Sequence, residues 1–573
     1  MGQKAIDLLG KIENWSKKWW AKLLLFVGGF FFILLCHFAF CFKIDGFYGN
    51  DEYGFRNLAS MRAAICVFVI ALVLIVFVSG YLFYKKQLTK KRLQFAILLI
   101  VFTIVLLLGG FNNFNNNRFS HDFQVFSKGG HWEIIYDIYQ TGKIPPVDLT
   151  NQFYQVKFYH ATSAYFAKFF SFLIPETPRI SISIFQGEAF LSLHDAASLE
   201  CIRILETYFG CLNFYFIAKI FGYLFETNET RSLLSSSFCF VVPALYFVIY
   251  SKNNDLFALT FSLLSLLLAL CWRKKRSYAK SVFLALSISV AMESKLNSAL
   301  IAFPIAFIFL LEFLRLYSKK NEVAKNERLS FWLEILCFGV LVFPLALFGH
   351  IYQMVKYGEP FGYVLDLEAN GPNYMHVDNA FYTSFFRFFA FPSPDLWSDV
   401  SNIRAYIPRP GGPSEQYIWG KIDYNAWTAF LKTSLWEEHN AYYLIGTSSF
   451  DVFLVYLLYG LFVLFAFLIS FMLLFKGVSY LYGIKEKQRG LKLSFSNSFL
   501  LILGLTQAFA YLYFCYKYQV GCTMNARYAL LLYLPLSALL SDFFLTFLKK
   551  PKASKKLFQK KNAQTLPKGD NLR

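Results

Sequence analysis

Long apolar runs alternate with short polar segments along most of the chain. Each run is about long enough to cross a ~30 Å hydrocarbon layer as an α-helix, except the short run at 281–292, which Glu293 and Lys295 follow. The runs lie at 21–42, 64–84, 93–111, 208–225, 233–250, 256–272, 281–292, 296–316, 336–352, 450–475, 499–516 and 529–547. This pattern predicts an all-α polytopic membrane protein with about twelve transmembrane helices.

Two long polar segments, 111–206 and 353–449, interrupt the apolar pattern. Connections of this length are uncommon and are usually either functional or disordered. In the first segment, aromatic residues recur at spacings that predict short helices lying on a membrane surface, and Pro145-Pro146 separates two of these helices. We therefore expect the site in this segment.

Composition and charge agree with a membrane protein and predict its orientation. The chain has 56% hydrophobic and only 16% charged residues, more apolar content than the core of a water-soluble protein needs. The formal charge of +20 could indicate nucleic-acid binding, but the basic clusters occupy alternate connections, as the positive-inside rule requires. The pattern favours membrane lipids over nucleic acid as a partner. It also predicts a multi-pass cell-membrane protein with both termini in the cytoplasm.

The expected organisation of the chain follows. A cytoplasmic N-terminus (1–20) precedes three transmembrane helices (21–110) and the first outer segment with the proposed catalytic site (111–206). Transmembrane helices 4 to 9 (207–352), the second outer segment (353–449), helices 10 to 12 (450–547) and a basic cytoplasmic tail (548–573) complete it. The ten cysteines are scattered without metal-ligand spacing and are interpreted as packing residues.

The order of motifs resembles one superfamily of membrane enzymes. An apolar span is followed by His121-Asp122, Gly130-His131, an aromatic helix, GKIP at 142–145 and a second surface helix. Further along come NND at 253–255, Lys295, LKTSL at 431–435, and CTMN at 522–525 before Arg527-Tyr528. This order resembles bacterial members of the glycosyltransferase C (GT-C) superfamily, similar to the protein O-mannosyltransferases and the aminoarabinose transferases of lipid A.

The resemblance implies a GT-C fold and a polyprenyl-phosphate sugar donor. It also implies an acidic catalytic residue in the first outer segment, an extracytoplasmic acceptor that is a cell-envelope glycan, lipid or protein, and transfer with inversion. The chain departs from the family at 154–160, which reads YQVKFYH where many relatives have a Tyr-His-Pro-Pro-Leu-like run. Lys157 would add a charge there, and His160 is the histidine that the run retains.

Sugar transfer from a polyprenyl phosphate needs a base for the acceptor hydroxyl and positive charge for the departing phosphate. Asp122 is the expected catalytic base, with His121 and His131 as neighbouring substrate-binding groups. Two alternatives remain for the acidic residue. Asp122 could instead cap the following helix, and the base could be Asp51 or Glu52 in the first outer turn.

Arg527 is the expected phosphate ligand, because a guanidinium offers a planar fork of donors. Tyr528 beside it, together with Lys157, His160, Asp255 and Lys295, completes the expected substrate-binding set. The alternatives are that Arg527 anchors the chain at the membrane interface, that Glu293 pairs with Lys295, and that Asp255 only binds a loop.

Two other functions remain as alternatives to a glycosyltransferase. A transporter or flippase of lipid-linked saccharide would have broken helices and buried charge near the membrane midplane, whereas the charges here lie mainly at the ends of spans. An oligosaccharide ligase or polymerase would take a diphosphate-linked donor. No cofactor is expected. His121, Asp122 and His131 could collect a divalent ion, but they match no standard metal-site spacing, so this alternative is not supported.

Overall fold

A computed structural model gives the fold of the chain. It describes residues 18–38, 58–111, 131–145, 156–174, 182–184, 187–189, 193–249, 251, 253–318, 325–357, 405–408, 417–420, 426–436, 449–485, 494–517 and 525–547. All structural statements below concern these residues.

Helices make up almost all of the described structure. The first group comprises α2 (Trp19–Cys36), α3 (Leu58–Tyr84), α4 (Lys90–Phe111), α5 (His131–Thr141), α6 (Phe158–Ser171), α7 (Leu193–Glu200), α8 (Ile202–Leu224), α9 (Glu229–Phe240) and α10 (Ala244–Phe247). The second comprises α11 (Asp255–Lys274), α12 (Tyr278–Ser294), the 3₁₀-helix η4 (Leu296–Ile301), α13 (Ala302–Tyr317), α14 (Lys325–Ala346) and α15 (Phe348–Tyr357). The third comprises α17 (Ala426–Trp436), α18 (Ser449–Lys485), α19 (Phe495–Lys517), the 3₁₀-helix η9 (Ala526–Leu532) and α20 (Tyr533–Phe547).

Two small antiparallel hairpins supplement the helices. Strands β1 (Ile182–Ile184) and β2 (Gly187–Ala189) pair with Ser183 opposite Glu188. Strands β3 (Ala405–Pro408) and β4 (Tyr417–Gly420) pair with Tyr406 opposite Trp419. Both lie in the segments expected to be long polar loops, so the polytopic all-α architecture is confirmed with two short local exceptions.

Nine helices in the described part of the chain are long and apolar enough to cross a membrane, and Trp20–Cys36 is a shorter apolar helix. Two expected spans are shorter or interrupted. The run at 233–250 is divided into α9 and α10, because Pro243 lacks the backbone donor that a continuing helix needs. The run at 281–292 lies within α12, which has 17 residues.

The expected span at 336–352 was placed too far along the chain. Helix α14 already begins at Lys325 and ends at Ala346, just after Pro344, and the separate helix α15 follows. The polar residues in the first turn of α14 hid its start, because a hydropathy pattern registers only the apolar part of a helix.

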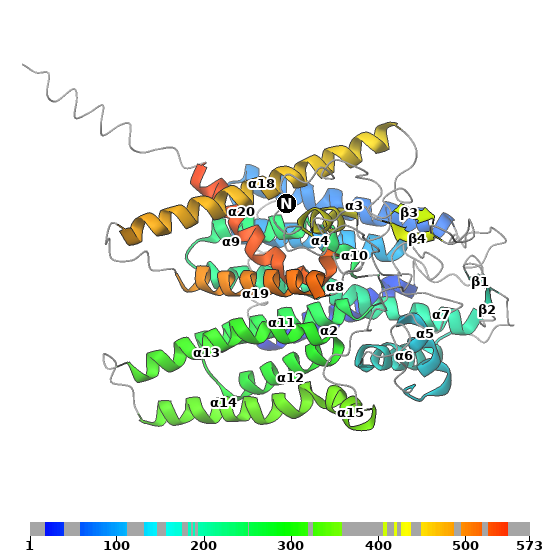
Figure 1. Cartoon of the computed structure of the whole chain (residues 1–573). Coiled ribbons are helices and arrows are strands. Elements are labelled where there is room, and N and C mark those ends of the chain that lie inside the picture. Colours follow the sequence, from blue (N-terminus) through cyan, green and yellow to red (C-terminus); the bar gives the residue numbers. More distant parts are fainter. Residues whose placement is uncertain are drawn as a thin grey trace, which may run out of the picture.

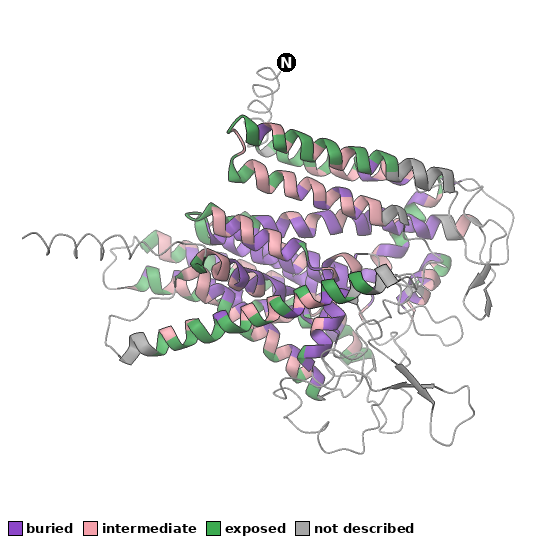
Figure 2. Cartoon of the chain, turned by 90° about the horizontal axis from the view of Figure 1, so that it is seen from above, coloured by how far each residue is buried: buried purple, intermediate pink, exposed green. Residues whose placement is uncertain are grey.

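The helices at the centre of the bundle are buried, and those at its edge are exposed. In the most apolar 18-residue stretch of each helix, 72% of the residues are buried in α8 and in α11. The corresponding share is 11% in α3 and 17% in α18. Figure 2 shows this gradient from the buried centre to the exposed outer helices. Exposed apolar faces are expected where helices contact lipid, and the backbone hydrogen bonds stay within each helix, as hydrocarbon requires.

The two ends of the bundle differ in character. Helices α5, α6, α7 and α15 and the β-hairpins gather at one end, whereas α13 and α14 meet at the other (Figure 1). Ion pairs link helix ends at that second end. They include Lys91 to Glu229 (3.4 Å), Arg231 to Asp542 (2.6 Å), Lys274 to Glu226 (2.5 Å) and Arg276 to Glu312 (3.3 Å). We call the first end the site end.

Candidate active site

The start of α11 places a carboxylate against a lysine. The Asn253 side chain accepts a hydrogen bond from Asp255 N at 2.8 Å, which fixes the first turn of α11. The Asp255 carboxylate then forms an ion pair with Lys295, which directly follows α12. Their side chains are 5% and 17% exposed, so the pair is largely removed from water. The structure thus places Asp255 against Lys295, whereas Glu293 contacts Gly349.

Two cations meet at one tyrosine ring. Lys295 Nζ lies 4.5 Å from the centre of the Tyr528 ring, and Arg527 Cζ lies 5.2 Å from it. Arg527 Nη2 also donates to the Tyr528 hydroxyl at 3.3 Å. An aromatic face attracts cations through its quadrupole, so one ring holds two positive groups close together. Asp255, Lys295, Arg527 and Tyr528 are called the Tyr528 cluster below.

The segment that carries Arg527 is held by polar contacts from its own helix and from α17. The Asn525 side chain accepts from Arg527 N at 2.9 Å, and Thr433 Oγ1 accepts from Ala526 N at 2.9 Å. Ala529 has non-helical backbone angles (φ −138°, ψ 37°), so η9 joins α20 through a kink. The segment 353–449 therefore contributes α17 directly to the position of Arg527.

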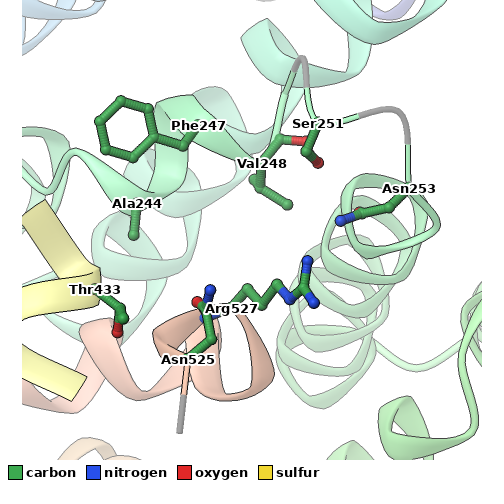
Figure 3. A pocket seen from close by; sticks show the side chains of 8 residues that line it. All are labelled: Ala244, Phe247, Val248, Ser251, Asn253, Thr433, Asn525 and Arg527. Atoms are coloured by element: carbon green, nitrogen blue, oxygen red, sulfur yellow. The ribbon is translucent and has the colours of Figure 1, made fainter. Parts of the chain in front are cut away.

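A small pocket opens beside Arg527. Its lining combines apolar side chains of the α10 region with neutral polar groups and one guanidinium (Figure 3). The lining residues are Ala244, Phe247, Val248, Ser251, Asn253, Thr433, Asn525 and Arg527. In Figure 3 the Arg527 side chain extends from η9 towards Asn253. This arrangement can present a fixed positive charge to an anionic group, with hydroxyl and amide groups nearby.

Helices α5 and α6 pack together near the start of α11. The end of α5 is set by Gly142, which has φ +66° and lets the chain turn back. Ile134, Ile135 and Ile138 of α5 are fully buried against α6. The Tyr159 ring of α6 lies 5.0 Å from the Phe257 ring of α11, in an edge-to-face contact. Phe257 is two residues beyond Asp255, so the helix pair lies close to the Tyr528 cluster.

The helix pair contains a buried histidine pair. His131 Nδ1 lies 2.7 Å from His160 Nε2, and both rings are buried. At this distance one nitrogen donates and the other accepts, so the contact needs a single shared proton. Burial lowers the pKa of His160 well below its ordinary value, and positive charge on His131 or Lys157 acts in the same direction. Lys157 is also buried.

The structure therefore brings the expected residues together in two groups. Asp255, Lys295, Arg527 and Tyr528 form one, and His131, His160 and Lys157 lie in the adjacent helix pair. His121 and Asp122 lie outside the described residues, as do the alternative acids Asp51 and Glu52. In the described part of the chain, no group of three or more His, Cys, Asp or Glu side chains is arranged to hold a metal ion.

A buried charge cluster at the start of α8 was not predicted from the sequence. Arg203 Nε lies 2.6 Å from Glu200 Oε2, and both side chains are at most 2% exposed. Glu206, one turn further along, is also buried. The signal in the sequence was an arginine flanked by two acids at the start of an apolar span. Buried charge beside a membrane is costly and usually has a role, so this pattern could have identified the cluster.

Comparison with known proteins supports a glycosyltransferase. The family model for dolichyl-phosphate-mannose-protein mannosyltransferases matches residues 187–343. The matched region includes α8, α11 and α12, and with them Asp255 and Lys295. A search of curated proteins found no match. This match over part of the chain supports a polytopic membrane glycosyltransferase of the GT-C type, similar to the dolichyl-phosphate-mannose-protein mannosyltransferases.

Proposed function

We propose that the protein transfers a single sugar from a polyprenyl-phosphate donor to a glycan, lipid or protein outside the cytoplasm. The Tyr528 cluster is the observation that carries this proposal. Lys295 and Arg527 come from distant parts of the chain, yet both lie against one ring. Two preorganised cations can stabilise the charge that develops on a departing phosphate, and burial strengthens that effect.

In the proposed reaction, an acceptor hydroxyl attacks the anomeric carbon of the donor sugar. Its proton passes to the Asp122 carboxylate, the bond from sugar to phosphate oxygen breaks, and polyprenyl phosphate leaves with the electron pair. Lys295 and Arg527 bind the phosphate, and attack from the opposite face inverts the anomeric carbon. The role of Asp122 rests on the family resemblance, and no metal ion is needed for these steps.

We further propose that the site end faces outwards and that both termini are cytoplasmic. The basic helix ends at the opposite end of the bundle support this orientation, because lysine and arginine are enriched on the cytoplasmic side. Lys143, which is exposed at the site end, should then react with an impermeant amine reagent added outside intact cells. Labelling only after the membrane is opened would reverse the orientation.

The proposed function is tested by offering donors to the purified protein in lipid nanodiscs. Matched polyprenyl-phosphate and polyprenyl-diphosphate sugars are supplied, and release of the lipid carrier is measured. Turnover with the monophosphate is expected, and Asp122→Asn should lower it by about 10²–10⁴-fold. Turnover with the diphosphate alone would indicate a ligase or polymerase. Normal turnover in Asp122→Asn, with loss in Asp51→Asn, would move the base to the first outer turn.

A further inference from the structure

Three consecutive residues at the end of α12 contact different parts of the protein. Glu293 Oε1 accepts a hydrogen bond from Gly349 N of α15 at 2.9 Å. The Ser294 carbonyl accepts from the Asn254 side chain at 2.7 Å, and Lys295 pairs with Asp255. The 293–295 segment thus lies between α15 and the Tyr528 cluster.

Gly349 lies so close to Glu293 that a side chain would not fit. A Cβ atom added at Gly349 would lie 2.5 Å from Glu293 Oε2 and 2.5 Å from Val156 Cγ1. Side-chain atoms do not approach this closely, so a larger residue at 349 would force Glu293 and Val156 to shift. Val156 directly precedes Lys157 and α6, whereas α15 directly follows α14. The end of α12 therefore contacts the first outer segment and α15 at the same point.

Simpler roles for Glu293 do not explain this position. Glu293 lies in the last turn of α12, where a negative charge would oppose the helix dipole, so electrostatic stabilisation of α12 does not explain its position. It is not the group that the structure places against Lys295 either, because Asp255 fills that position. Its contact with Gly349 joins the end of α12 to α15 instead.

We infer that Glu293 is a positioning residue, and that its contact with Gly349 of α15 holds Lys295 in place. This inference rests on the proposed function, in which Lys295 binds the donor phosphate. Lys295 has an extended backbone (φ −158°, ψ 123°) directly after α12, so its side chain follows any movement of the last helical turn. A misplacement of ~1 Å in a reacting site can lower the rate by about 100-fold.

A double-variant cycle tests the coupling. Glu293→Ala removes the contact with Gly349, whereas Gly349→Ala displaces both Glu293 and Val156. Each should raise the donor KM by about tenfold, and the double variant should raise it no more than Gly349→Ala alone. The acceptor KM should stay within about twofold, because the contact acts on the donor site. Glu293→Gln keeps an acceptor oxygen and should be near wild type. Gly339→Ala is the matched control, since a Cβ there meets nothing closer than 3.9 Å.

A second readout does not depend on catalysis. The rate at which an amine reagent modifies Lys295 is measured by mass spectrometry in each variant. If Glu293 holds Lys295 in place, Glu293→Ala and Gly349→Ala should both raise this rate, and Gly339→Ala should not. Unchanged Lys295 reactivity, or additive effects in the double variant, would overturn the inference. Lack of turnover in the wild type would instead refute the proposed function, and the labelling result would still decide the role of Glu293.

Discussion

Removing Lys295 from its ion pair with Asp255 should destabilise the protein more than removing Asp255. Lys295→Met would leave the Asp255 carboxylate without this partner at 5% exposure. Removing one partner of a buried pair typically costs about 3–5 kcal/mol, because the remaining charge stays desolvated. Asp255→Asn should cost less, about 1–3 kcal/mol, because Lys295 is 17% exposed and its flexible stem can carry the ammonium towards water. The double variant Asp255→Asn/Lys295→Met should cost less than the sum of the two.

The assay is the rate of irreversible unfolding in detergent at a fixed temperature, since the stability of a large membrane protein is operationally a rate. If the pair is broken in the transition state, a loss of 3 kcal/mol accelerates unfolding by about 100-fold. Lys143→Met, at an exposed lysine, is the control and should unfold like the wild type. Additive effects of the two substitutions, or a larger cost for Asp255→Asn than for Lys295→Met, would refute the reasoning.

Four further predictions concern single positions. Arg527→Lys should weaken donor binding by about ten- to a hundredfold if the guanidinium binds phosphate as a fork, whereas full activity would indicate an anchoring role. Tyr528→Phe should keep the donor KM within about threefold, and Tyr528→Leu should raise it about five- to thirtyfold, because two cation–π contacts are lost. Gly210→Ala should destabilise the protein by about 1–3 kcal/mol, because the added methyl would meet the Ile249 side chain at 2.7–3.0 Å. Gly222→Ala is the control and should leave stability unchanged, because a methyl there would have no atom within 4 Å. Burial lowers the pKa of His160, so as pH falls below about 6.5 only the unfolded chain gains a proton there and the protein should become less stable. In unfolding assays across pH, His160→Gln should make this decline smaller.

The sequence alone was sufficient for the class of the protein and for most of its helices. A membrane span must satisfy its backbone within one continuous helix of about twenty apolar residues, so its signal is local and readable. Where this local signal was incomplete, the assignment was less accurate. Pro243 divided an expected span, and the polar first turn of α14 concealed its beginning.

The sequence also singled out the members of the Tyr528 cluster, because charge and amide groups at the ends of apolar spans are conspicuous. It did not determine their partners. Glu293 is two residues from Lys295 and was the partner that the sequence suggested, yet α12 ends between them. The helix directs Glu293 to Gly349, and the extended residue after it directs Lys295 to Asp255.

Only the tertiary structure brought α5, α6, the start of α11, the end of α12 and η9 together. The contacts of His131 with His160, of Lys295 with Tyr528 and of Glu293 with Gly349 all join residues that are far apart in the chain. Such contacts depend on how helices pack in three dimensions, and hydropathy carries no information about which polar side chains will meet. The sequence indicated a membrane glycosyltransferase scaffold, and helix packing decided which of its charged residues meet.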